Sequence, residues 1–383
     1  MKIGINLLFL TNNVSSGVGK YIESLLSGYH KIDLLKDCYL FVRESYYEKA
    51  KELFPEATVI TVHAPSIITS LLKYKKKRHS FYECLYLNRY KFKDAVVNAK
   101  VDLILYPFND CTLYFAEGLP NILVLHDLYY LRYPEHYGQL MYLYAKSKHE
   151  YFLKKASAVI TVSEFVKSEI LSHIKASKNI FIQVIPNAVS TAKNFTNFIP
   201  VEGPYILSVG SQTKNKNIMT LLKSYNLIKK RLPHQLVLLG KHKEDTEEIQ
   251  NYIKEHDLND RVLCLEGVPD EHRNSLYQHA SLLVAPSLCE NFGRAPIEAA
   301  LLKIPVITAK TSALPEVTLG LLTYYEPATD SHALAMKMID VLRNPPLPEV
   351  REQIACTYAR VYDEASIANR FYHIFESLFT HSS

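Results

Sequence analysis

The stretch SLLVAPSLCENFGRAPIEAA, residues 281–300, carries the pattern that decides the fold. The apolar run from Ser281 to Ala285 predicts a strand, the loop after it ends at Glu290, and the next helix carries Glu298. Gly293 marks the turn at the start of this helix, where backbone N–H groups favour an anion. A buried strand, a loop and a helix in this order indicate one unit of a parallel α/β sheet.

The same unit recurs along both halves of the chain. Short apolar runs that alternate with helical patterns predict parallel, doubly wound sheets. The first half has predicted strands at 3–9, 38–42, 58–62, 103–106, 122–125, 158–162 and 182–185, with a helix over 19–35. The second half has them at 205–209, 235–239, 262–266, 281–285, 305–308 and 321–324. A length of 383 residues fits two domains better than one core.

The pattern predicts two Rossmann-like domains joined by a polar linker. We expect an N-terminal domain over residues 1–188, a linker over 189–204, a C-terminal domain over 205–362 and a final helix over 363–383. The apolar residues of that helix, such as Ile367, Phe371 and Ile374, form a stripe that needs a partner. Ligands of such sheets bind outside the carboxyl ends of the strands. Two facing domains therefore predict a site in an interdomain cleft.

Composition and the start of the chain indicate a protein that works in a reducing, aqueous compartment. The hydrophobic fraction is 48%, the formal net charge is +5, and none of the six cysteines forms a C-x-x-C pair. No run approaches the roughly 18 apolar residues of a membrane span. The start, Met1 to Phe9, has the pattern of a strand and not of a signal peptide. These features predict a cytoplasmic protein with thiols in the reduced form.

One basic stretch has two interpretations. Between residues 70 and 93 basic side chains alternate with Leu, Phe and Tyr, and the densest part holds Lys73, Lys75, Lys76, Lys77 and Arg78. An amphipathic helix on an anionic membrane surface would explain this pattern, and so would a solvated helical face. Nucleic-acid binding is not expected, because no recognised binding module accompanies the charge.

Several other motifs follow predicted strands. The segment S-G-V-G-K, 16–20, opens the first helix, and H-D-L, 126–128, follows the strand at 122–125. An ordinary tight turn and a packed histidine would account for each of them taken alone. Lys214 and Lys216 lie in a loop after the strand at 205–209, where a solvated loop is the simple explanation. Ser163 precedes a helix and is predicted to be its N-cap.

In combination these motifs resemble glycosyltransferase family 4, whose retaining enzymes have the GT-B fold of two facing Rossmann-like domains. The two carboxylates at 290 and 298 match its E-x7-E signature. The matching segments follow in order along the chain: 16–20, 126–135, 185–189, 205–218, 267–270, 285–299 and 312–317. In this family the final helix crosses back to pack on the N-terminal domain, and the same is expected here.

The resemblance implies roles for individual residues. His126 would contact the transferred sugar and help to stabilise the transition state, with Asp127 orienting its ring. Glu290, the second expected catalytic residue beside His126, would contact the donor sugar, and Glu298 would accept hydrogen bonds from the ribose hydroxyls. The backbone N–H groups that line the sugar and phosphate would be those of Asn291, Phe292 and Gly293. The groups that approach the donor phosphates would be Gly17 and Lys216.

One residue of the family pattern is missing. The phosphate-binding Arg of the loop after residue 209 is absent, and Ser211 or Asn215 stands where it is usual. Lys214 and Arg294 are the candidate substitutes, although an ammonium does not reproduce a bidentate guanidinium. The chain shows no D-x-D pair, so neither a metal ion nor any other cofactor is expected.

The resemblance thus implies a retaining glycosyltransferase. It would move a hexose of the mannose or glucose type from a UDP- or GDP-sugar to a hydroxyl of a glycan or lipid-linked glycan, in cell-surface polysaccharide synthesis. It would work in the cytoplasm or peripherally at the inner face of the membrane. The alternatives are an inactive, nucleotide-sugar-binding scaffold protein, motivated by the missing Arg, and a sugar-nucleotide epimerase of the same fold.

Overall fold

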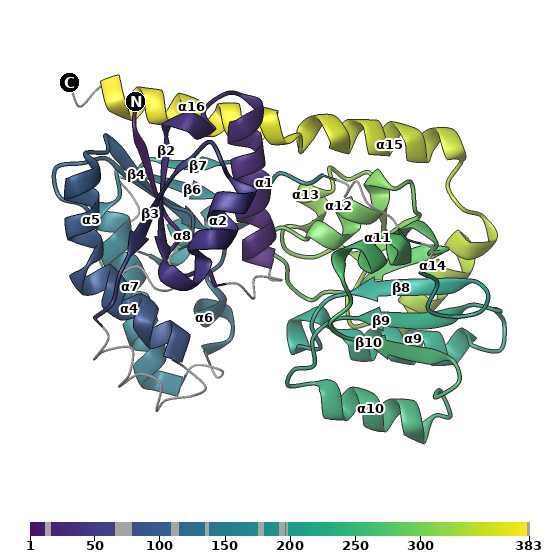
Figure 1. Ribbon diagram of the computed structural model, residues 1–383. Coiled ribbons are helices and arrows are strands. Elements are labelled where there is room, and N and C mark those ends of the chain that lie inside the picture. The colour runs from purple at the N-terminus through teal and green to yellow at the C-terminus, as the bar shows by residue number, and fades with distance from the viewer. Residues whose placement is uncertain are drawn as a thin grey trace. The chain divides into compact units, whose positions relative to one another are not determined.

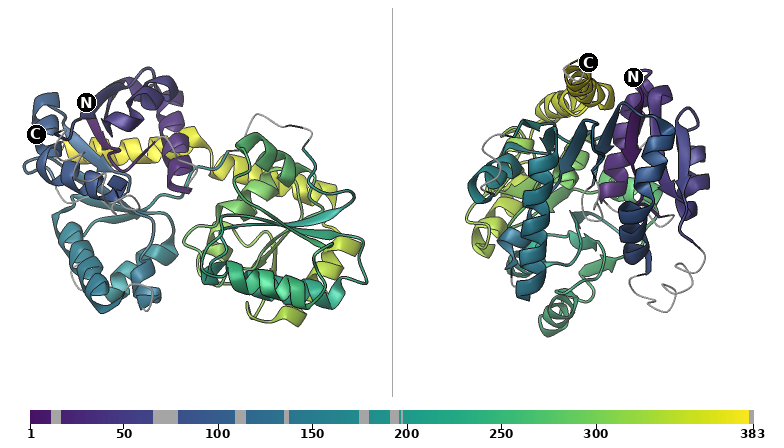
Figure 2. Two further views of the ribbon diagram at one scale, coloured as in Figure 1. Left: turned by 60° about the horizontal axis from the view of Figure 1, so that its bottom comes forward. Right: turned by 90° about the vertical axis from the view of Figure 1, so that its left-hand side faces the viewer.

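The chain divides into two compact units in the computed structural model. The structure describes residues 1–11, 17–65, 79–108, 115–134, 138–174, 180–190, 196 and 198–380. The first unit comprises Met1–Ala188 and Glu364–Ser383, and the second comprises Val189–Asp363. Each unit has one all-parallel sheet with helices on both of its faces (Figures 1 and 2). The predicted class, an α/β protein with two parallel sheets, is confirmed.

In the first unit the strand order is β3-β2-β1-β4-β5-β6-β7. The strands are β1 (Ile3–Asn6), β2 (Cys38–Arg43), β3 (Thr58–Val62), β4 (Leu103–Tyr106), β5 (Asn121–Leu125), β6 (Ala158–Thr161) and β7 (Ile182–Val184). All of them lie at the predicted places, because uninterrupted apolar runs are buried on both faces. The first strand is shorter than expected and ends at Asn6, whose Oδ1 accepts a hydrogen bond from Leu8 N at 3.1 Å.

Helices cover both faces of this sheet. They are α1 (Gly17–Lys31), α2 (Tyr47–Leu53), α4 (His79–Tyr90), α5 (Phe92–Ala99), α6 (Tyr129–Arg132), α7 (Gly138–Lys155), α8 (Glu164–His173) and α16 (Glu364–Thr380). One core joins α1 and α16 to the sheet through Leu25, Ile5 and Phe371. On the other face the ring of Phe92 in α5 meets that of Phe41 in β2 edge-on, with centroids 5.2 Å apart.

The C-terminal helix packs on the first unit, as predicted. Glu364 Oε2 accepts a hydrogen bond from Ser27 Oγ at 2.6 Å and pairs with Lys31 Nζ at 2.9 Å, both on α1. A Cβ at Gly28 would overlap the carbonyl oxygen of Glu364, so only glycine permits this close approach of the two helices. Further along α16, Arg370 Nη2 donates to Val184 O at 2.5 Å. The stripe of Ile367, Phe371 and Ile374 is thereby buried.

The second unit repeats the plan with strand order β10-β9-β8-β11-β12-β13. Its strands are β8 (Tyr205–Val209), β9 (Gln235–Leu239), β10 (Val262–Leu265), β11 (Leu282–Ala285), β12 (Val306–Ala309) and β13 (Thr323–Tyr325). Its helices are α9 (Ile218–Ile228), α10 (Thr246–Glu255), α11 (Asp270–Gln278), α12 (Arg294–Leu301), α13 (Leu314–Val317), α14 (Ser331–Arg343) and α15 (Pro348–Val361). Each predicted strand is present, with bounds shifted by two residues at most.

The segment predicted as a linker belongs to the second unit by its contacts. Val189 N donates to Tyr362 O at 3.0 Å, and Thr196 N donates to Ser275 Oγ at 2.8 Å. The start of this unit is therefore tied to Tyr362, directly after α15, and to α11. Within the described part of the chain, no helix has the length and apolar character needed to cross a membrane.

Candidate active site

The centre of the candidate site in the second unit is an ion pair between two predicted donor-binding residues. Lys216 Nζ lies 2.5 Å from Glu290 Oε1, although the two residues are 74 positions apart. Their side chains are 26% and 16% exposed, so the pair is reachable from solvent but partly desolvated. Lys216 follows β8, and Glu290 follows β11, its neighbour in the sheet. The structure therefore brings both residues together at the carboxyl edge of the sheet, where ligands of such sheets bind.

Three hydrogen bonds fix the loops that carry this pair. Leu288 N donates to Asn215 O at 2.8 Å, which ties the Glu290 loop to the Lys216 loop. Asn217 has a left-handed backbone with φ of 55° and buries its amide, which donates to Pro286 O at 2.9 Å and to Ala328 O at 2.8 Å. The sequence predicted Asn217 only as one residue of the segment 205–218 that resembles the family. A polar residue directly before a helix was the only signal of its anchoring role.

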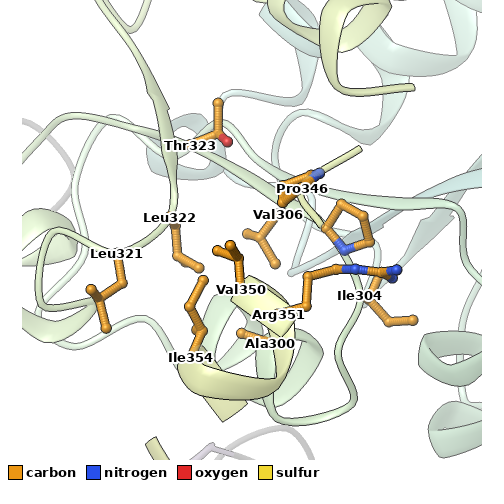
Figure 3. Close-up of a pocket in the computed structure, with 11 residues that line it drawn as sticks. Ala300, Ile304, Val306, Leu321, Leu322, Thr323, Pro346, Val350, Arg351 and Ile354 are labelled. Atoms are coloured by element: carbon orange, nitrogen blue, oxygen red, sulfur yellow. The ribbon is translucent and has the colours of Figure 1, made fainter. Parts of the chain in front are cut away.

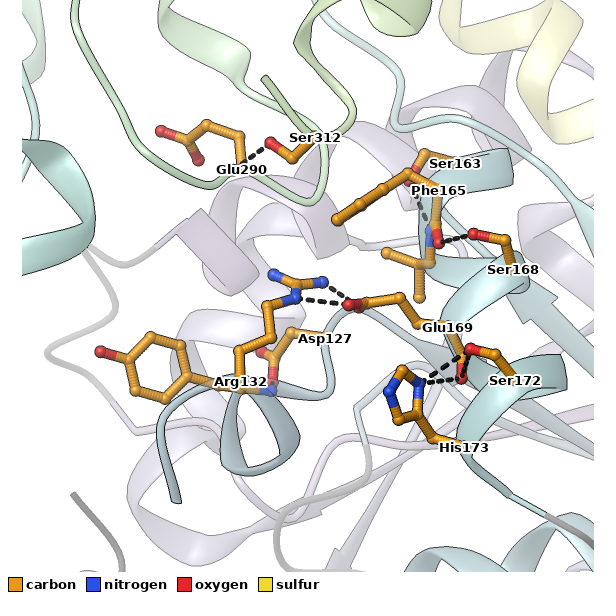
Figure 4. A network of polar contacts seen from close by, with 12 residues as sticks. Asp127, Arg132, Ser163, Phe165, Ser168, Glu169, Ser172, His173, Glu290 and Ser312 are labelled. Carbon is orange, nitrogen blue, oxygen red and sulfur yellow. Dashed lines mark hydrogen bonds and ion pairs between the residues drawn. The ribbon is translucent and has the colours of Figure 1, made fainter. Parts of the chain in front are cut away.

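Two serines hold Glu290 in place. Ser287 Oγ donates to Glu290 Oε1 at 2.7 Å. Glu290 N donates to Ser312 Oγ at 2.8 Å (Figure 4). Ser312 has a φ of 47°, a left-handed conformation that a non-glycine residue adopts at a cost of about 1 kcal/mol or more. The carboxylate is therefore held in one orientation. Sequence reasoning assigned no role to these serines, since their side chains meet Glu290 only after folding.

Gly293 directly precedes α12 at the N-cap position with a φ of 84°, as the predicted turn requires. A Cβ at this position would lie 2.8 Å from Leu314 Cδ2, so glycine is needed for space as well as for conformation. The side chain of Phe292 is 4% exposed and meets the ring of Tyr362 edge-on at 5.6 Å. Phe292 can thus offer a ligand only its backbone, which agrees with the role expected for it.

Glu298 lies in a second polar group on α12. Its Oε1 is 3.3 Å from Arg294 Nε, one helical turn earlier, and its Oε2 accepts a hydrogen bond from the hydroxyl of Tyr277 at 3.0 Å. Tyr277 is buried, and burial raises the pKa of its hydroxyl well above the usual value. Arg294, a candidate substitute for the missing Arg, is thus paired with Glu298 in the described structure. Tyr277 was missed by the sequence interpretation.

The loop after β8, where the family has its phosphate-binding Arg, holds no buried basic side chain at Lys214 or at Asn215. Lys214, the first candidate substitute, is exposed in a single turn of 3-10 helix, Lys214–Lys216. Asn215 Oδ1 accepts a hydrogen bond from Thr213 Oγ1 at 2.7 Å, and its amide lies 3.5 Å from Cys289 O. Among the described residues of this loop, Lys216 is the basic side chain paired with Glu290.

In the first unit, His126 lies directly after β5 and its ring is held on two sides. Nε2 is 2.9 Å from Pro107 O, and the ring of Tyr21 approaches it edge-on with centroids 4.5 Å apart. Because a carbonyl oxygen only accepts hydrogen bonds, Nε2 carries the proton and Nδ1 has the free lone pair of the neutral ring. Burial lowers the pKa of His126 below its usual value of 6.5, with the Pro107 carbonyl opposing the shift. The ring is therefore suited to accept a hydrogen bond.

The predicted role of Asp127 as the residue that orients this ring is wrong. Asp127 is exposed, and its Oδ1 accepts a hydrogen bond from Tyr129 N at 3.1 Å, so it shapes the turn into α6. The carbonyl of Pro107 holds the ring instead.

The helices near Asp127 are joined by an arginine. Arg132 of α6 donates to Glu169 of α8, with Nε 2.7 Å from Oε1, and its guanidinium lies over the ring of Phe165 at 4.7 Å (Figure 4). Ser163 caps α8, as predicted, by accepting a hydrogen bond from Val166 N at 3.3 Å. This network fixes α6 and α8 against each other.

The remaining predictions are tested only in part. Gly17 is exposed at the first residue of α1, with nothing near the place of a Cβ, whereas Ser16 lies outside the described residues. The basic cluster of Lys73, Lys75, Lys76, Lys77 and Arg78 also lies outside them. No group of acidic, histidine or cysteine side chains suited to hold a metal ion occurs within the described residues.

A cavity of about 110 Å³ lies elsewhere in the second unit (Figure 3). It is lined mainly by apolar side chains, including those of Val306, Leu322 and Ile354, with Arg351 at its wall. Val306 and Thr323 begin β12 and β13, so the cavity lies at the amino edge of the sheet. Glu290 follows the carboxyl end of β11, and the cavity is therefore not part of the candidate active site.

The comparisons with known proteins agree with this geometry. The family model described as "Glycosyltransferase Family 4" matches residues 15–193, and the one described as "Glycosyl transferases group 1" matches residues 189–357. The chain belongs to glycosyltransferase family 4. It is 30% identical to the O-antigen chain mannosyltransferase RfbU of Salmonella typhimurium over 57% of this chain and 61% of that protein. It is 28% identical to the O-antigen chain mannosyltransferase B of Escherichia coli over 55% of this chain and 59% of that protein.

Solved structures show the same fold. Sucrose-phosphate synthase from Thermosynechococcus elongatus aligns over 100% of both chains with a TM-score of 0.73 and 19% identity. HepE from Anabaena in complex with UDP-glucose aligns over 98% of this chain and 100% of that one, with a TM-score of 0.68 and 17% identity. These likenesses establish the GT-B fold. The chain spans about three fifths of the length of the curated relatives it matches.

Proposed function

We propose that this protein is a retaining glycosyltransferase that moves a hexose from a nucleotide diphosphate sugar to a hydroxyl of a glycan or lipid-linked glycan. The observation that carries the proposal is the Lys216–Glu290 pair at the carboxyl edge of the second sheet. The cation suits the phosphates of such a donor, which need positive charge nearby. The carboxylate suits its sugar, whose hydroxyls donate hydrogen bonds.

The leaving group of this reaction is the nucleotide diphosphate, which gathers negative charge in the transition state. Lys216 would stabilise that charge, together with the N–H groups at the helix starts near Gly17 and Gly293. Within the second unit, the loops that carry Lys216 and Glu290 are tied together by the hydrogen bond from Leu288 N to Asn215 O. We propose on the same ground that transfer needs no metal ion, which unchanged activity in excess chelator would support.

The sugar and ribose contacts complete the assignment. Glu290 would accept hydrogen bonds from the sugar, and Glu298, oriented by Tyr277, would accept them from the ribose. His126 would offer the Nδ1 lone pair to a sugar hydroxyl, because Nε2 is occupied by Pro107 O. No residue is assigned as a covalent nucleophile. We propose that the leaving phosphate helps to deprotonate the acceptor.

The relatives favour mannose as the transferred sugar. Both of the O-antigen proteins described above are named as mannosyltransferases. HepE binds UDP-glucose, which supports a nucleotide sugar as the donor class. We therefore place the reaction in cell-surface polysaccharide synthesis, at the inner face of the membrane, where the basic cluster of residues 73–78 would attract anionic lipid.

A donor screen tests this proposal. Purified protein is heated with GDP-mannose, UDP-glucose, UDP-N-acetylglucosamine and the free diphosphates, and slow hydrolysis of each sugar is followed in parallel. We expect one donor to raise the melting temperature and to be hydrolysed slowly. A folded protein that responds to none of them would refute a transferase of this donor class.

One observation keeps a second candidate function open. Ser211 and Asn215 stand where the family has its phosphate-binding Arg, and Lys216 is paired with Glu290. A scaffold protein that binds a nucleotide sugar without transferring it would also show these features. It would give a selective thermal shift with GDP-mannose or UDP-glucose but neither hydrolysis nor transfer, so the same screen separates the two functions.

A further inference from the structure

The cavity at the amino edge of the second sheet is apolar except for two of its side chains. Its volume is about 110 Å³, and nine of the 11 residues that line it are apolar, the other two being Thr323 and Arg351 (Figure 3). Protein interiors hold few voids larger than a water molecule, so an apolar cavity of this size needs an explanation. An unfilled cavity costs stability, whereas a ligand that fills it restores the missing contacts.

Four segments of the second unit form most of the wall. They are the end of α12 at Ala300, the start of β12 at Val306, the start of β13 and the first two turns of α15. On α15, Val350 and Ile354 are one turn apart and therefore lie on the same face of the helix. Val350 is 42% exposed and Leu321 is 41% exposed, so the cavity reaches the surface beside them. A small molecule can enter there without unfolding of the unit.

Arg351 brings a positive charge to this wall. Its Nη1 donates to Lys303 O at 3.0 Å, which holds the guanidinium in place. Its Nε is buried and has no hydrogen-bond partner among the described residues. The adjacent acid, Glu352, pairs with Lys303 Nζ instead. A buried donor of a charged group is costly without an acceptor, so this position fits an acceptor that a ligand supplies.

The size of the cavity and the free edge of the guanidinium define the ligand. An apolar cavity of about 150 Å³ holds a benzene molecule, so one of about 110 Å³ has room for about four or five carbon atoms. Because Nη1 of Arg351 is engaged by Lys303 O, the edge formed by Nε and Nη2 is the one to which a carboxylate can bind with two parallel hydrogen bonds. A neutral hydrocarbon would fill the space but leave Nε without an acceptor.

We propose that this cavity binds a small aliphatic monocarboxylate. Its hydrocarbon part lies among Val306, Leu322 and Ile354, and its carboxylate accepts hydrogen bonds from Arg351. The site is distinct from the candidate active site, because Glu290 follows the carboxyl end of β11 and the cavity lies at the opposite edge of the sheet. The proposal therefore does not depend on the proposed function.

Isothermal titration with three small probes tests the site. For 3-methylbutanoate we expect a dissociation constant of about 1 mM or lower. Its uncharged isostere 3-methylbutanamide should bind about tenfold more weakly, because it offers Arg351 only a neutral acceptor. Acetate keeps the charge but lacks most of the hydrocarbon part, and it should also bind about tenfold more weakly or worse. The absence of saturable binding of 3-methylbutanoate would overturn the proposal, and so would equal affinity for either of the other probes.

Three variants locate the binding in the cavity. Arg351→Gln should weaken binding of 3-methylbutanoate about tenfold and leave that of the amide unchanged. Val350→Glu, at a half-exposed wall position that tolerates a polar side chain, should weaken binding of the acid more than that of the amide, because like charges repel. Arg360→Gln, at an exposed position of the same helix, is the matched control and should keep both affinities. The parent's preference for the acid, if unchanged in Arg351→Gln or in Val350→Glu, would overturn the proposal.

Discussion

Replacing Glu290 by glutamine removes the negative charge of the Lys216–Glu290 pair and keeps the size of the side chain. The two charges lie 2.5 Å apart, which at an effective dielectric constant of about 20 corresponds to an attraction of ~7 kcal/mol before desolvation. Exposed pairs contribute about 0–1 kcal/mol, and breaking a buried pair costs about 3–5 kcal/mol. Side chains that are 26% and 16% exposed fall between these limits, at about 2 kcal/mol.

This estimate leads to opposite effects on binding and on transfer. A diphosphate that binds the parent protein must compete with Glu290 for Lys216, whereas in Glu290→Gln the lysine is released at little cost. If about 1.4 kcal/mol of the pair energy is recovered, the free nucleotide diphosphate binds about tenfold more tightly. Transfer should fall by about 100-fold or more, because the carboxylate that would contact the sugar is lost.

The assays are isothermal titration with the free diphosphate and initial rates of transfer. Glu326→Gln is the matched control: it removes another Lys–Glu pair of the same unit, Lys310–Glu326 at 3.1 Å, and should change neither quantity. Weaker diphosphate binding by Glu290→Gln would contradict the competition argued here. Full transfer activity in this variant would contradict the assignment of Glu290 itself.

Three further predictions concern the histidine, a helix cap and a glycine. Since the pKa of His126 is lowered, its ring should remain neutral as the pH falls through 6.5, and nitrogen NMR spectra should place the ring proton on Nε2. The unfolded chain binds a second ring proton at a higher pH than the folded chain, so the unfolding free energy should fall as the pH drops below 6.5. A cationic ring at neutral pH would contradict this assignment. Ser163→Ala removes the cap of α8 and should lower the unfolding free energy by about 1 kcal/mol in a urea titration, whereas Ser168→Ala, in the exposed part of the same helix, should have a smaller effect. In Gly293→Ala the new Cβ would clash with Leu314, and the backbone φ is unfavourable for alanine, so this variant should lose donor-induced thermal stabilisation. Gly320→Ala, with a φ of 68° and open space around the Cβ, has only the backbone cost of about 1 kcal/mol. Equal behaviour of the two variants would refute the steric argument.

Local patterns predicted the elements of the fold well. The strands from β2 to β12 appear within a few residues of their predicted places, because a fully buried parallel strand needs an uninterrupted apolar run. The first strand ends early at Asn6, where a polar side chain caps the turn, and β13 begins two residues late. The resemblance to a known family, and not periodicity, supplied the candidate site residues.

Side-chain partners far apart in the sequence were not predictable in the same way. Lys216 and Glu290 were each proposed as donor ligands, but their pairing depends on β8 and β11 being neighbours in the sheet. Asp127 was expected to orient His126 because both lie in the segment that resembles the family. In the folded chain the carboxylate turns to Tyr129 N and the carbonyl of Pro107 reaches the ring.

The sequence by itself therefore determined the two parallel α/β units, the places of their strands and the family to which the chain belongs. These properties depend on burial patterns over a few residues and on short motifs. Only the tertiary structure decided which groups meet: the serines that hold Glu290 and the tyrosine beside Glu298. Such contacts follow from strand order and loop geometry, which no local pattern contains.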